Sequence, residues 1–148
     1  MDGRDEPDKR EKGSAESRIG SGQRIILVDD KAEMIELGAE MLELLGYRVT
    51  TYTQPEAALA AVKQTPDQID LLITDLTMPR MTGKYLAREV SKARSDLPLV
   101  LSSGFRGDLD RDQARELGFS AVLGKPYNLK ELSDTFAEVF EEWISEKV

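Results

Sequence analysis

The chain has 148 residues, enough for one domain with its own hydrophobic core. Because it contains no cysteine and no histidine, it excludes disulfides and thiolate metal sites, and it lacks both a cysteine nucleophile and the commonest general base. A net charge of −8 argues against nucleic-acid binding through a basic face.

The first 22 residues are polar, carry charges of both signs and contain, after Met1, one large apolar residue, Ile19. Such a segment cannot offset its ordering entropy by burial, so we predict a disordered arm or linker over 1–22 and a folded domain over 23–148. There is no signal-peptide core, and no apolar run approaches the roughly 20 residues of a membrane span. We therefore expect a cytoplasmic protein that makes no membrane contact.

Five apolar or β-branched runs follow the arm, and they predict five strands. The runs are RIILV (24–28), YRVTTY (47–52), LLIT (71–74), LPLVLS (97–102) and SAVL (120–123). Continuous apolar runs are typical of strands that are covered on both faces, whereas the alternation in YRVTTY indicates a strand nearer an edge.

Helical periodicity separates the strands. In residues 31–46 the predicted buried stripe consists of Met34, Leu37, Met41 and Leu45. Gly46 suits a left-handed stop after this helix. Thr53 and Glu56 have the spacing of a capping box for the next helix.

Shorter amphipathic segments at 84–94 and 109–117 predict two more helices. Asn128, with Glu131 three residues later, predicts the start of the last helix. Its apolar stripe, which we interpret as core packing rather than a cofactor site, consists of Leu129, Leu132, Phe136, Val139, Phe140 and Trp143. Strands alternating with helices predict an α/β fold with a parallel sheet covered on both faces.

Ligands of such sheets bind beyond the carboxyl ends of the strands, so the residues at those ends are the candidates for chemistry. They are Asp29, Asp30, Asp75, Ser102, Ser103 and Lys125. Alone, each has an ordinary structural explanation as a cap, a turn residue or a surface lysine. Together they place three carboxylates, hydroxyls and one ammonium group on one rim.

Two like charges 4 Å apart repel by about 4 kcal/mol at an effective dielectric constant of 20, so three clustered carboxylates need cations. Lys125 supplies one positive charge, which leaves a net charge of about −2 on the cluster. A divalent ion with all-oxygen ligation, such as Mg²⁺, would neutralise it. A metal ion and an ammonium group together can neutralise a phosphoryl group while one aspartate attacks it.

The segments ILVDD, DLLITDLTMPRMTG, PLVLSSG and GKP, in this order and spacing, resemble the receiver domain of two-component response regulators. The resemblance runs from about Arg24 to Glu146. It implies a single flavodoxin-like (βα)5 domain, a doubly wound parallel sheet with strand order 2-1-3-4-5. It also implies phosphotransfer to Asp75 from a histidine kinase or a phosphotransfer protein, which fits the absence of histidine here. The chain would then be a phosphoacceptor, not a turnover enzyme, and any self-association would be a weak homodimer.

Residue roles follow from the same resemblance. Asp30, Asp75 and the backbone carbonyl of Thr77 would bind Mg²⁺ directly, and Asp29 would act through a coordinated water. Ser103 would take the switch hydroxyl position, which Ser102 does not align with. Lys125 would pair with the phosphoryl group, and its bond to Pro126 would be cis.

One position departs from the family pattern. Receivers usually carry an aromatic residue three positions before the lysine, and here it is Val122. The usual relay from the hydroxyl to an aromatic ring therefore has no ring to turn at this position. We expect the response to phosphorylation to concentrate in residues 103–112, with Tyr127 as a further mobile candidate.

Two other classes of protein compete with this interpretation. A small Mg²⁺-dependent phosphatase of the haloacid dehalogenase type needs a second aspartate two residues after the nucleophile, where this chain has Thr77. A flavodoxin that binds FMN needs a phosphate loop after the first strand, where DDKAEM would repel a phosphate. The segment GSGQRIILVDD resembles the linker that enters the C-terminal receiver of a hybrid sensor kinase, but a stand-alone receiver with no output domain fits equally well.

Overall fold

The computed structural model describes residues 20–104 and 111–147, in which strands and helices alternate as predicted. The strands are Arg24–Val28 (β1), Arg48–Tyr52 (β2), Leu71–Asp75 (β3), Leu99–Ser103 (β4) and Ala121–Gly124 (β5). The helices are Ala32–Leu44 (α2), Pro55–Gln64 (α3), Gly83–Ala93 (α4), Arg111–Glu116 (α5), Leu129–Lys147 (α6) and a 3-10 turn, Pro66–Gln68 (η1).

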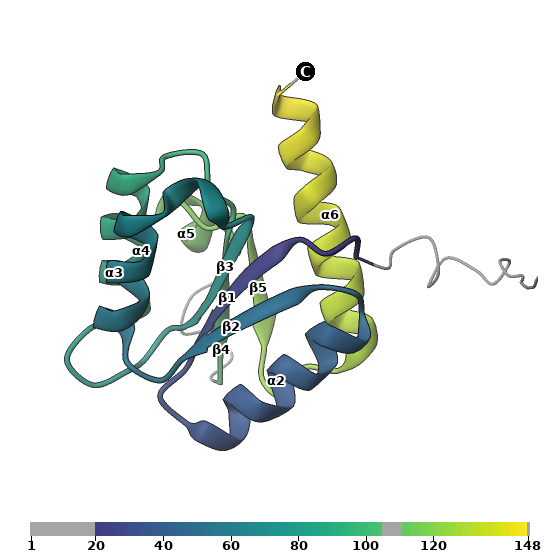
Figure 1. The fold of residues 1–148 in the computed structure, drawn as a ribbon, viewed down its shortest axis with the longest axis horizontal. Helices are drawn as coiled ribbons and strands as arrows, with labels where there is room; N and C mark the ends of the chain where they lie inside the picture. Colours follow the sequence, from purple (N-terminus) through teal and green to yellow (C-terminus); the bar gives the residue numbers. More distant parts are fainter. Residues whose placement is uncertain (1–19, 105–110, 148) are drawn as a thin grey trace, which may run out of the picture.

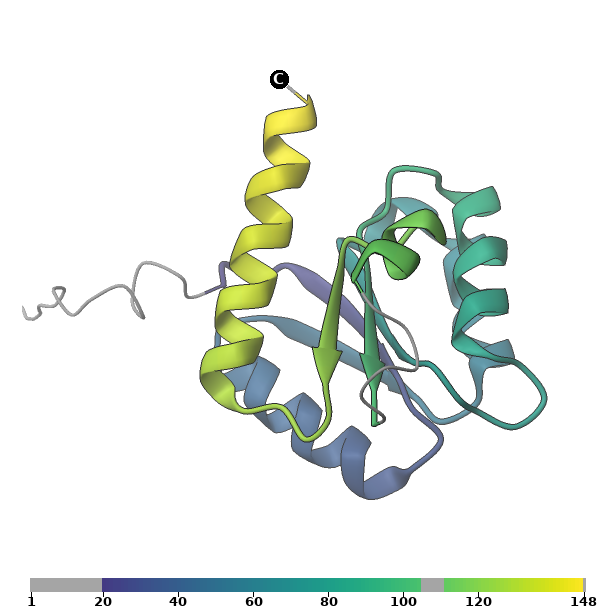
Figure 2. The same cartoon turned by 180° about the vertical axis from the view of Figure 1, so that it is seen from behind.

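The five strands form one parallel sheet in the order β2-β1-β3-β4-β5. Helices α2 and α6 cover one face, and α3, α4 and α5 cover the other (Figures 1 and 2). Every residue of the central strands β3 and β4 is buried, whereas β2 is largely exposed at the edge of the sheet. The structure therefore confirms the predicted flavodoxin-like topology and the edge position of the alternating strand.

The register of the strands brings their last residues to one rim. Val28 pairs with Thr74, Asp75 pairs with Ser102, and Ser103 pairs with Gly124. We call this rim the carboxyl edge and the opposite rim, where the strands begin, the amino edge. Because parallel strands end side by side, the acids after β1 and at the end of β3 become neighbours.

Helix α2 buries a stripe that overlaps only in part with the predicted one, since Leu45 is buried and Met41 is partly buried. The residues that face the sheet are Ile35, Gly38, Leu42 and Leu45, while Leu37 is 47% exposed. Gly38 packs closely against the core. An added Cβ there would lie 3.0 Å from both a Leu27 methyl group and the Tyr127 hydroxyl. The backbone of Gly46 has the predicted left-handed conformation, with φ 95°.

The two predicted capping boxes have opposite outcomes. At α6, the Asn128 side chain accepts from the Glu131 amide at 2.8 Å and the Glu131 side chain accepts from the Asn128 amide at 3.0 Å, as predicted. At α3 the prediction was wrong, because the helix begins at Pro55 with Gln54 as its cap residue. Glu56 binds Arg80 instead, at 2.9 and 3.2 Å.

The last helix supplies core residues as expected. Leu132, Phe136 and Val139 are buried, and Phe136 packs against Tyr47 with ring centroids 5.4 Å apart. Leu129, at the start of the helix, is 41% exposed and so departs from the predicted stripe.

The described chain begins beside the turn between α2 and β2. The Gly22 amide donates to the Gly46 carbonyl at 2.8 Å, and the Arg48 amide donates to the Gln23 carbonyl at 2.9 Å. Residues 1–19 lie outside the described residues, so the predicted arm stays a prediction.

Candidate phosphoacceptor site

The carboxyl edge holds two buried carboxylates bridged by one ammonium group. Asp29 and Asp75 are 3% and 4% exposed. The Lys125 Nζ lies 2.7 Å from Asp29 Oδ2 and 3.0 Å from Asp75 Oδ1. The lysine reaches both acids because it directly follows β5, whose partner strand β4 lies next to β3. The structure thus brings together three residues that are far apart in the sequence.

A third acid completes a cluster with excess negative charge. Oxygen atoms of Asp29, Asp30 and Asp75 all lie within 4.8 Å of one another. In the described part of the chain, Asp30 Oδ1 is the buried side-chain atom that has no hydrogen-bond partner. An unpartnered buried carboxylate oxygen beside two others is the donor set that a hard divalent cation such as Mg²⁺ prefers. The residues present therefore fit the expected metal ion.

The loop after β3 is shaped by a close backbone approach. The Gly83 amide donates to the Leu76 carbonyl at 2.8 Å, and an added Cβ on Gly83 would overlap the Asp75 carbonyl oxygen. Thr82 then caps α4 by accepting from the Tyr85 amide at 3.1 Å. The loop folds back over the strand end and brings Thr77 into the lining of a hollow of about 330 Å³.

The two serines at the end of β4 are oriented differently. Ser103 lines the hollow together with Asp75, Thr77 and Lys125. Ser102 is buried, and its Oγ donates to the Thr74 carbonyl at 3.4 Å. Ser103 is therefore the serine of this pair that lines the hollow with Asp75.

Burial and ion pairing set the charge states at the edge. Burial raises the pKa of Asp75 above its ordinary value, although the hydrogen bond from Lys125 acts in the opposite direction. Burial alone would lower the pKa of Lys125, but hydrogen bonds to Asp29 and Asp75 outweigh it and raise that pKa. The lysine is therefore held as a cation between the two acids.

The predicted elements of signal transmission are only partly described. Val122 packs at the border of the core beneath α3, α4 and α5. Tyr127 is 7% exposed, with its hydroxyl close to Gly38 of α2, and the Lys125–Pro126 bond is cis, as the family resemblance implies. Residues 105–110 lie outside the described residues, so the expected response of this loop remains a prediction.

Lys31 and Met34 also line the hollow, and the sequence reasoning did not select them. Lys31 Nζ lies 3.7 Å from Asp30 Oδ1, and its amide donates to Asp29 Oδ1 at 3.0 Å. The available signal was position, because Lys31 directly follows the two acids. Met34 lies one helical turn further along α2.

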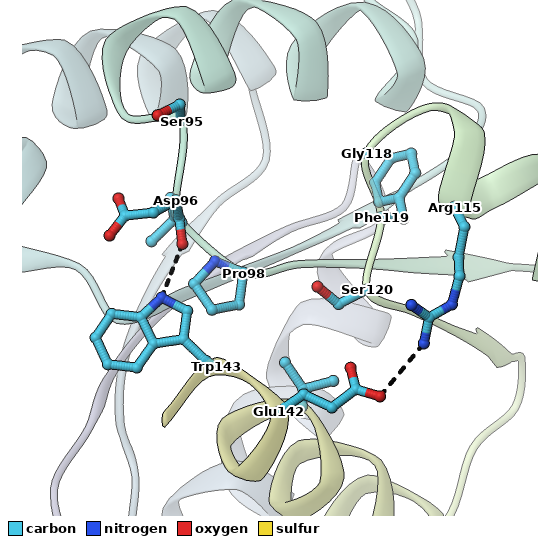
Figure 3. A pocket seen from close by; sticks show the side chains of 11 residues that line it. Ser95, Asp96, Pro98, Arg115, Gly118, Phe119, Ser120, Glu142 and Trp143 are labelled. Carbon is cyan, nitrogen blue, oxygen red and sulfur yellow. Dashed lines mark hydrogen bonds and ion pairs between the residues drawn. The ribbon is translucent and has the colours of Figure 1, made fainter. Parts of the chain in front are cut away.

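A second hollow, of about 230 Å³, lies at the amino edge between the start of β4, the turn before β5 and α6 (Figure 3). The Trp143 indole donates to the Asp96 carbonyl at 2.8 Å, and Arg115 pairs with Glu142 at 3.4 Å. These polar groups are already paired with one another. We therefore assign the chemistry to the hollow at the carboxyl edge.

Comparison with known proteins identifies the family. The sequence model of the response regulator receiver domain matches residues 25–137. The chain belongs to this family. The match covers the five strands apart from Arg24 and includes both acidic segments, and nothing in the comparisons supports a phosphatase of the haloacid dehalogenase type.

Individual relatives agree with this assignment. The chain is 29% identical over 136 residues to the sensor kinase CckA of Brucella abortus, covering 90% of this chain and 14% of CckA. It is 33% identical over 113 residues to the response regulator receiver protein CpdR of the same organism, covering 74% of this chain and 90% of CpdR. The non-phosphorylated receiver domain of HemR from Leptospira biflexa superimposes with a TM-score of 0.70 at 32% identity, covering 79% of this chain and 93% of that one. The chain spans less than half the length of several curated relatives.

In the described part of the chain, none of the helices is both long and apolar enough to cross a membrane.

Proposed function

We propose that Asp75 accepts a phosphoryl group from a phosphohistidine on a separate donor, either a histidine kinase or a phosphotransfer protein. The observation that carries this proposal is the carboxylate of Asp75, held 3.0 Å from Lys125 in an open hollow and beside two further acids. An oxygen of Asp75 forms the new bond to phosphorus while the donor's phosphorus–nitrogen bond breaks and the imidazole leaves. The chain is an acceptor in this scheme, and the chemistry takes place in the cytoplasm.

The neighbouring residues have separate tasks. Asp30, Asp75 and the Thr77 carbonyl would hold Mg²⁺, with Asp29 acting through a water. When bound, the ion would neutralise charge on the phosphoryl oxygens. Ser103 donates to a phosphoryl oxygen, and Lys125 exchanges part of its pairing with Asp75 for the phosphoryl group. Thr77 occupies the position at which a phosphatase of the haloacid dehalogenase type has its second aspartate, the general acid. This chain therefore has no proton donor there for rapid turnover.

A protein donor is supported by the exposed face of α2. Met34 lines the hollow, and Leu37 and Leu44 continue from it along the helix with 47% and 75% exposure. This apolar row starts at the acceptor, so it offers a contact surface for a helix of the donor. Leu37→Asp should slow transfer from the protein donor and leave labelling by acetyl phosphate unchanged, whereas Leu117→Asp, in the turn after α5, should affect neither reaction.

The direct test uses intact-mass measurement after incubation with acetyl phosphate and Mg²⁺. The unaltered chain and Asp70→Asn, a matched change at the amino edge, should each gain one phosphoryl group, and Asp75→Asn should gain none. A labelled Asp75→Asn protein would overturn the assignment. Loss of labelling in EDTA would support the role of the metal ion.

A further inference from the structure

Lys31 occupies a place that local helix energetics do not explain. It is the residue that caps α2, with φ −103° and ψ 116°, and its side chain makes no cap hydrogen bond. Lysine is a poor N-cap residue, and a cation near a helix N-terminus opposes the helix dipole. Serine, asparagine or aspartate would stabilise this helix start better. The lysine therefore carries a local cost that needs another reason.

The geometry around Lys31 points toward the acceptor. Its amide is fixed by Asp29 Oδ1 at 3.0 Å, so the backbone at residue 31 is held against the acidic cluster. The side chain lines the hollow that contains Asp75 and is 60% exposed. Its Nζ lies 3.7 Å from Asp30 Oδ1, within ion-pair range but without a hydrogen bond. Lys31 thus lines the same hollow as the reacting carboxylate, and its side chain is largely exposed to solvent.

The charge balance at the carboxyl edge explains why a cation at residue 31 is useful. The three carboxylates and Lys125 leave a net charge of about −2, which one divalent cation neutralises. Phosphorylation turns Asp75 into an acyl phosphate with about two negative charges, so the edge becomes negative again by about one charge. Lys31 supplies the one positive charge that restores neutrality.

We propose that Lys31 is a second phosphoryl-contacting cation, which lies beside Asp30 in the unmodified protein and turns to the phosphoryl oxygens once Asp75 is modified. The inference rests on the proposed function of Asp75. The proposed role of Lys31 predicts opposite changes in two affinities, those for Mg²⁺ and for the phosphoryl group. General damage to the site would instead weaken both. A cation at this place opposes Mg²⁺ binding and favours binding of the phosphoryl group.

The experiment compares Lys31→Met with Lys92→Met. Lys92 is 68% exposed and pairs with Glu89 at 2.9 Å, but it lies near the other end of α4, so its removal takes away the same charge far from the acceptor. Calorimetry measures Mg²⁺ affinity without phosphorylation. Fluorine NMR in saturating Mg²⁺ measures binding of beryllofluoride, a mimic of the phosphoryl group.

For Lys31→Met we expect Mg²⁺ to bind about threefold to fivefold more tightly and beryllofluoride about threefold to fivefold more weakly, the range for a partly exposed charge pair. Lys92→Met should leave both affinities unchanged, and Lys31→Arg should retain beryllofluoride binding. Lys31→Asn should raise the melting temperature by improving the cap while still weakening beryllofluoride, which excludes damage to the fold.

Unchanged affinities in Lys31→Met, or weaker binding of both ligands, would overturn the role of Lys31. Either result leaves the proposed function standing as long as Asp75→Asn alone abolishes labelling. A labelled Asp75→Asn protein would instead remove the proposed function on which the inference rests.

Discussion

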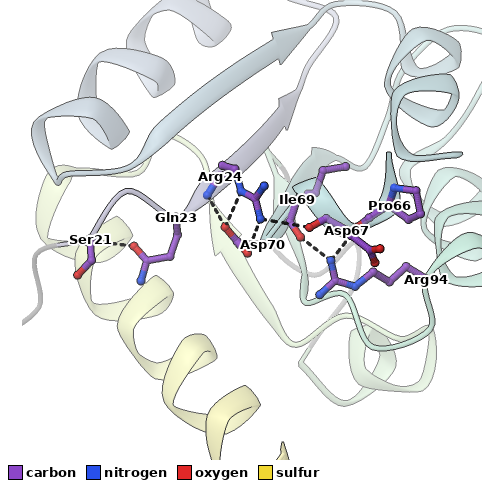
Figure 4. Close-up of polar contacts among 8 residues, drawn as sticks. All are labelled: Ser21, Gln23, Arg24, Pro66, Asp67, Ile69, Asp70 and Arg94. Atoms are coloured by element: carbon purple, nitrogen blue, oxygen red, sulfur yellow. Dashed lines mark hydrogen bonds and ion pairs between the residues drawn. The ribbon is translucent and has the colours of Figure 1, made fainter. Parts of the chain in front are cut away.

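The two edges of the sheet both carry buried or half-buried charges, but they balance them differently. At the amino edge, Arg94 donates to the carbonyls of Pro66 and Ile69 at 2.8 and 2.6 Å, and Arg24 pairs with Asp70 at 3.2 Å (Figure 4). Arg94 also donates to Asp96 at 2.9 Å. Both of these guanidinium groups have an acid and at least one backbone carbonyl as partners.

The carboxyl edge has three acids around one half-buried lysine, Lys125, and Asp30 Oδ1 has no hydrogen bond. Balanced charges hold loops in place, whereas an excess of one sign in a water-poor place requires a ligand of the other sign. The difference between the edges therefore separates a structural network from a binding site. The following predictions test that difference.

The largest expected effect is the loss of the bridging lysine. In EDTA, Lys125→Met should lower the free energy of unfolding by about 3 kcal/mol, because Asp29 and Asp75 stay buried without their cation. Mg²⁺ should restore part of this loss. Denaturant titrations with and without the metal measure both effects. Lys130→Met, which removes an 84% exposed lysine paired with Asp134, should change little, and a Lys125→Met protein of unaltered stability in EDTA would contradict the charge argument.

A change in the backbone of the carboxyl edge should cost slightly less. Gly83→Ala forces a methyl group against the Asp75 carbonyl, so we expect a loss of about 2 kcal/mol and slower labelling of Asp75. Gly124→Ala is the control, since its added Cβ meets nothing within 4 Å. Equal labelling rates for Gly83→Ala and the unaltered chain would mean that the loop does not depend on this approach.

A comparable change at the amino edge should affect stability alone. Arg94→Ala leaves the Pro66 and Ile69 carbonyls without their donor and should cost about 2 kcal/mol. The labelling rate of Asp75 should stay the same when measured where both proteins are folded. Arg88→Ala, on helix α4, which ends just before Arg94, should leave both properties unchanged. A slower labelling rate in Arg94→Ala would contradict the claim that the amino edge affects stability alone.

The smallest effect concerns acid stability. Burial acts to raise the pKa of Asp70, but hydrogen bonds from the amide and guanidinium of Arg24 outweigh it and hold that pKa below its ordinary value of 3.8. A carboxyl group with a lowered folded-state pKa stabilises the fold above the unfolded-state pKa, and this contribution is lost as the pH falls through the folded value.

Asp70→Asn should therefore destabilise the protein at neutral pH, by less than about 1 kcal/mol because the pair is partly exposed. The difference from the unaltered chain should shrink as the pH is lowered below 3.8. Denaturation midpoints on both sides of that value measure the trend. A difference that widens in acid would show that Asp70 acts through something other than its charge.

Much of this architecture is predictable because the relevant signals are local. Continuous apolar runs give the buried strands, Gly46 gives the end of α2, and the Asn128–Glu131 pair gives the start of α6. The acids at the ends of β1 and β3 are equally visible, because parallel strands must end at the same edge. Backbone conformation and strand polarity set all of these features, and neither depends on distant partners.

Long-range packing decided the rest. Helix α2 has apolar residues on adjacent stripes, and the close approach of Leu27 and Tyr127 turned Gly38 and Leu42, not Leu37, toward the sheet. Glu56 pairs with Arg80 from a distant loop and not with the amide of a local cap residue. The pairing of β4 with β5 places Lys125 beside Asp29 and Asp75. The sequence by itself determined the elements and the chemistry at the strand ends. Only the tertiary structure decided which helix face is buried and that Lys125 contacts Asp29 and Asp75 directly, because those outcomes depend on contacts between residues far apart in the chain.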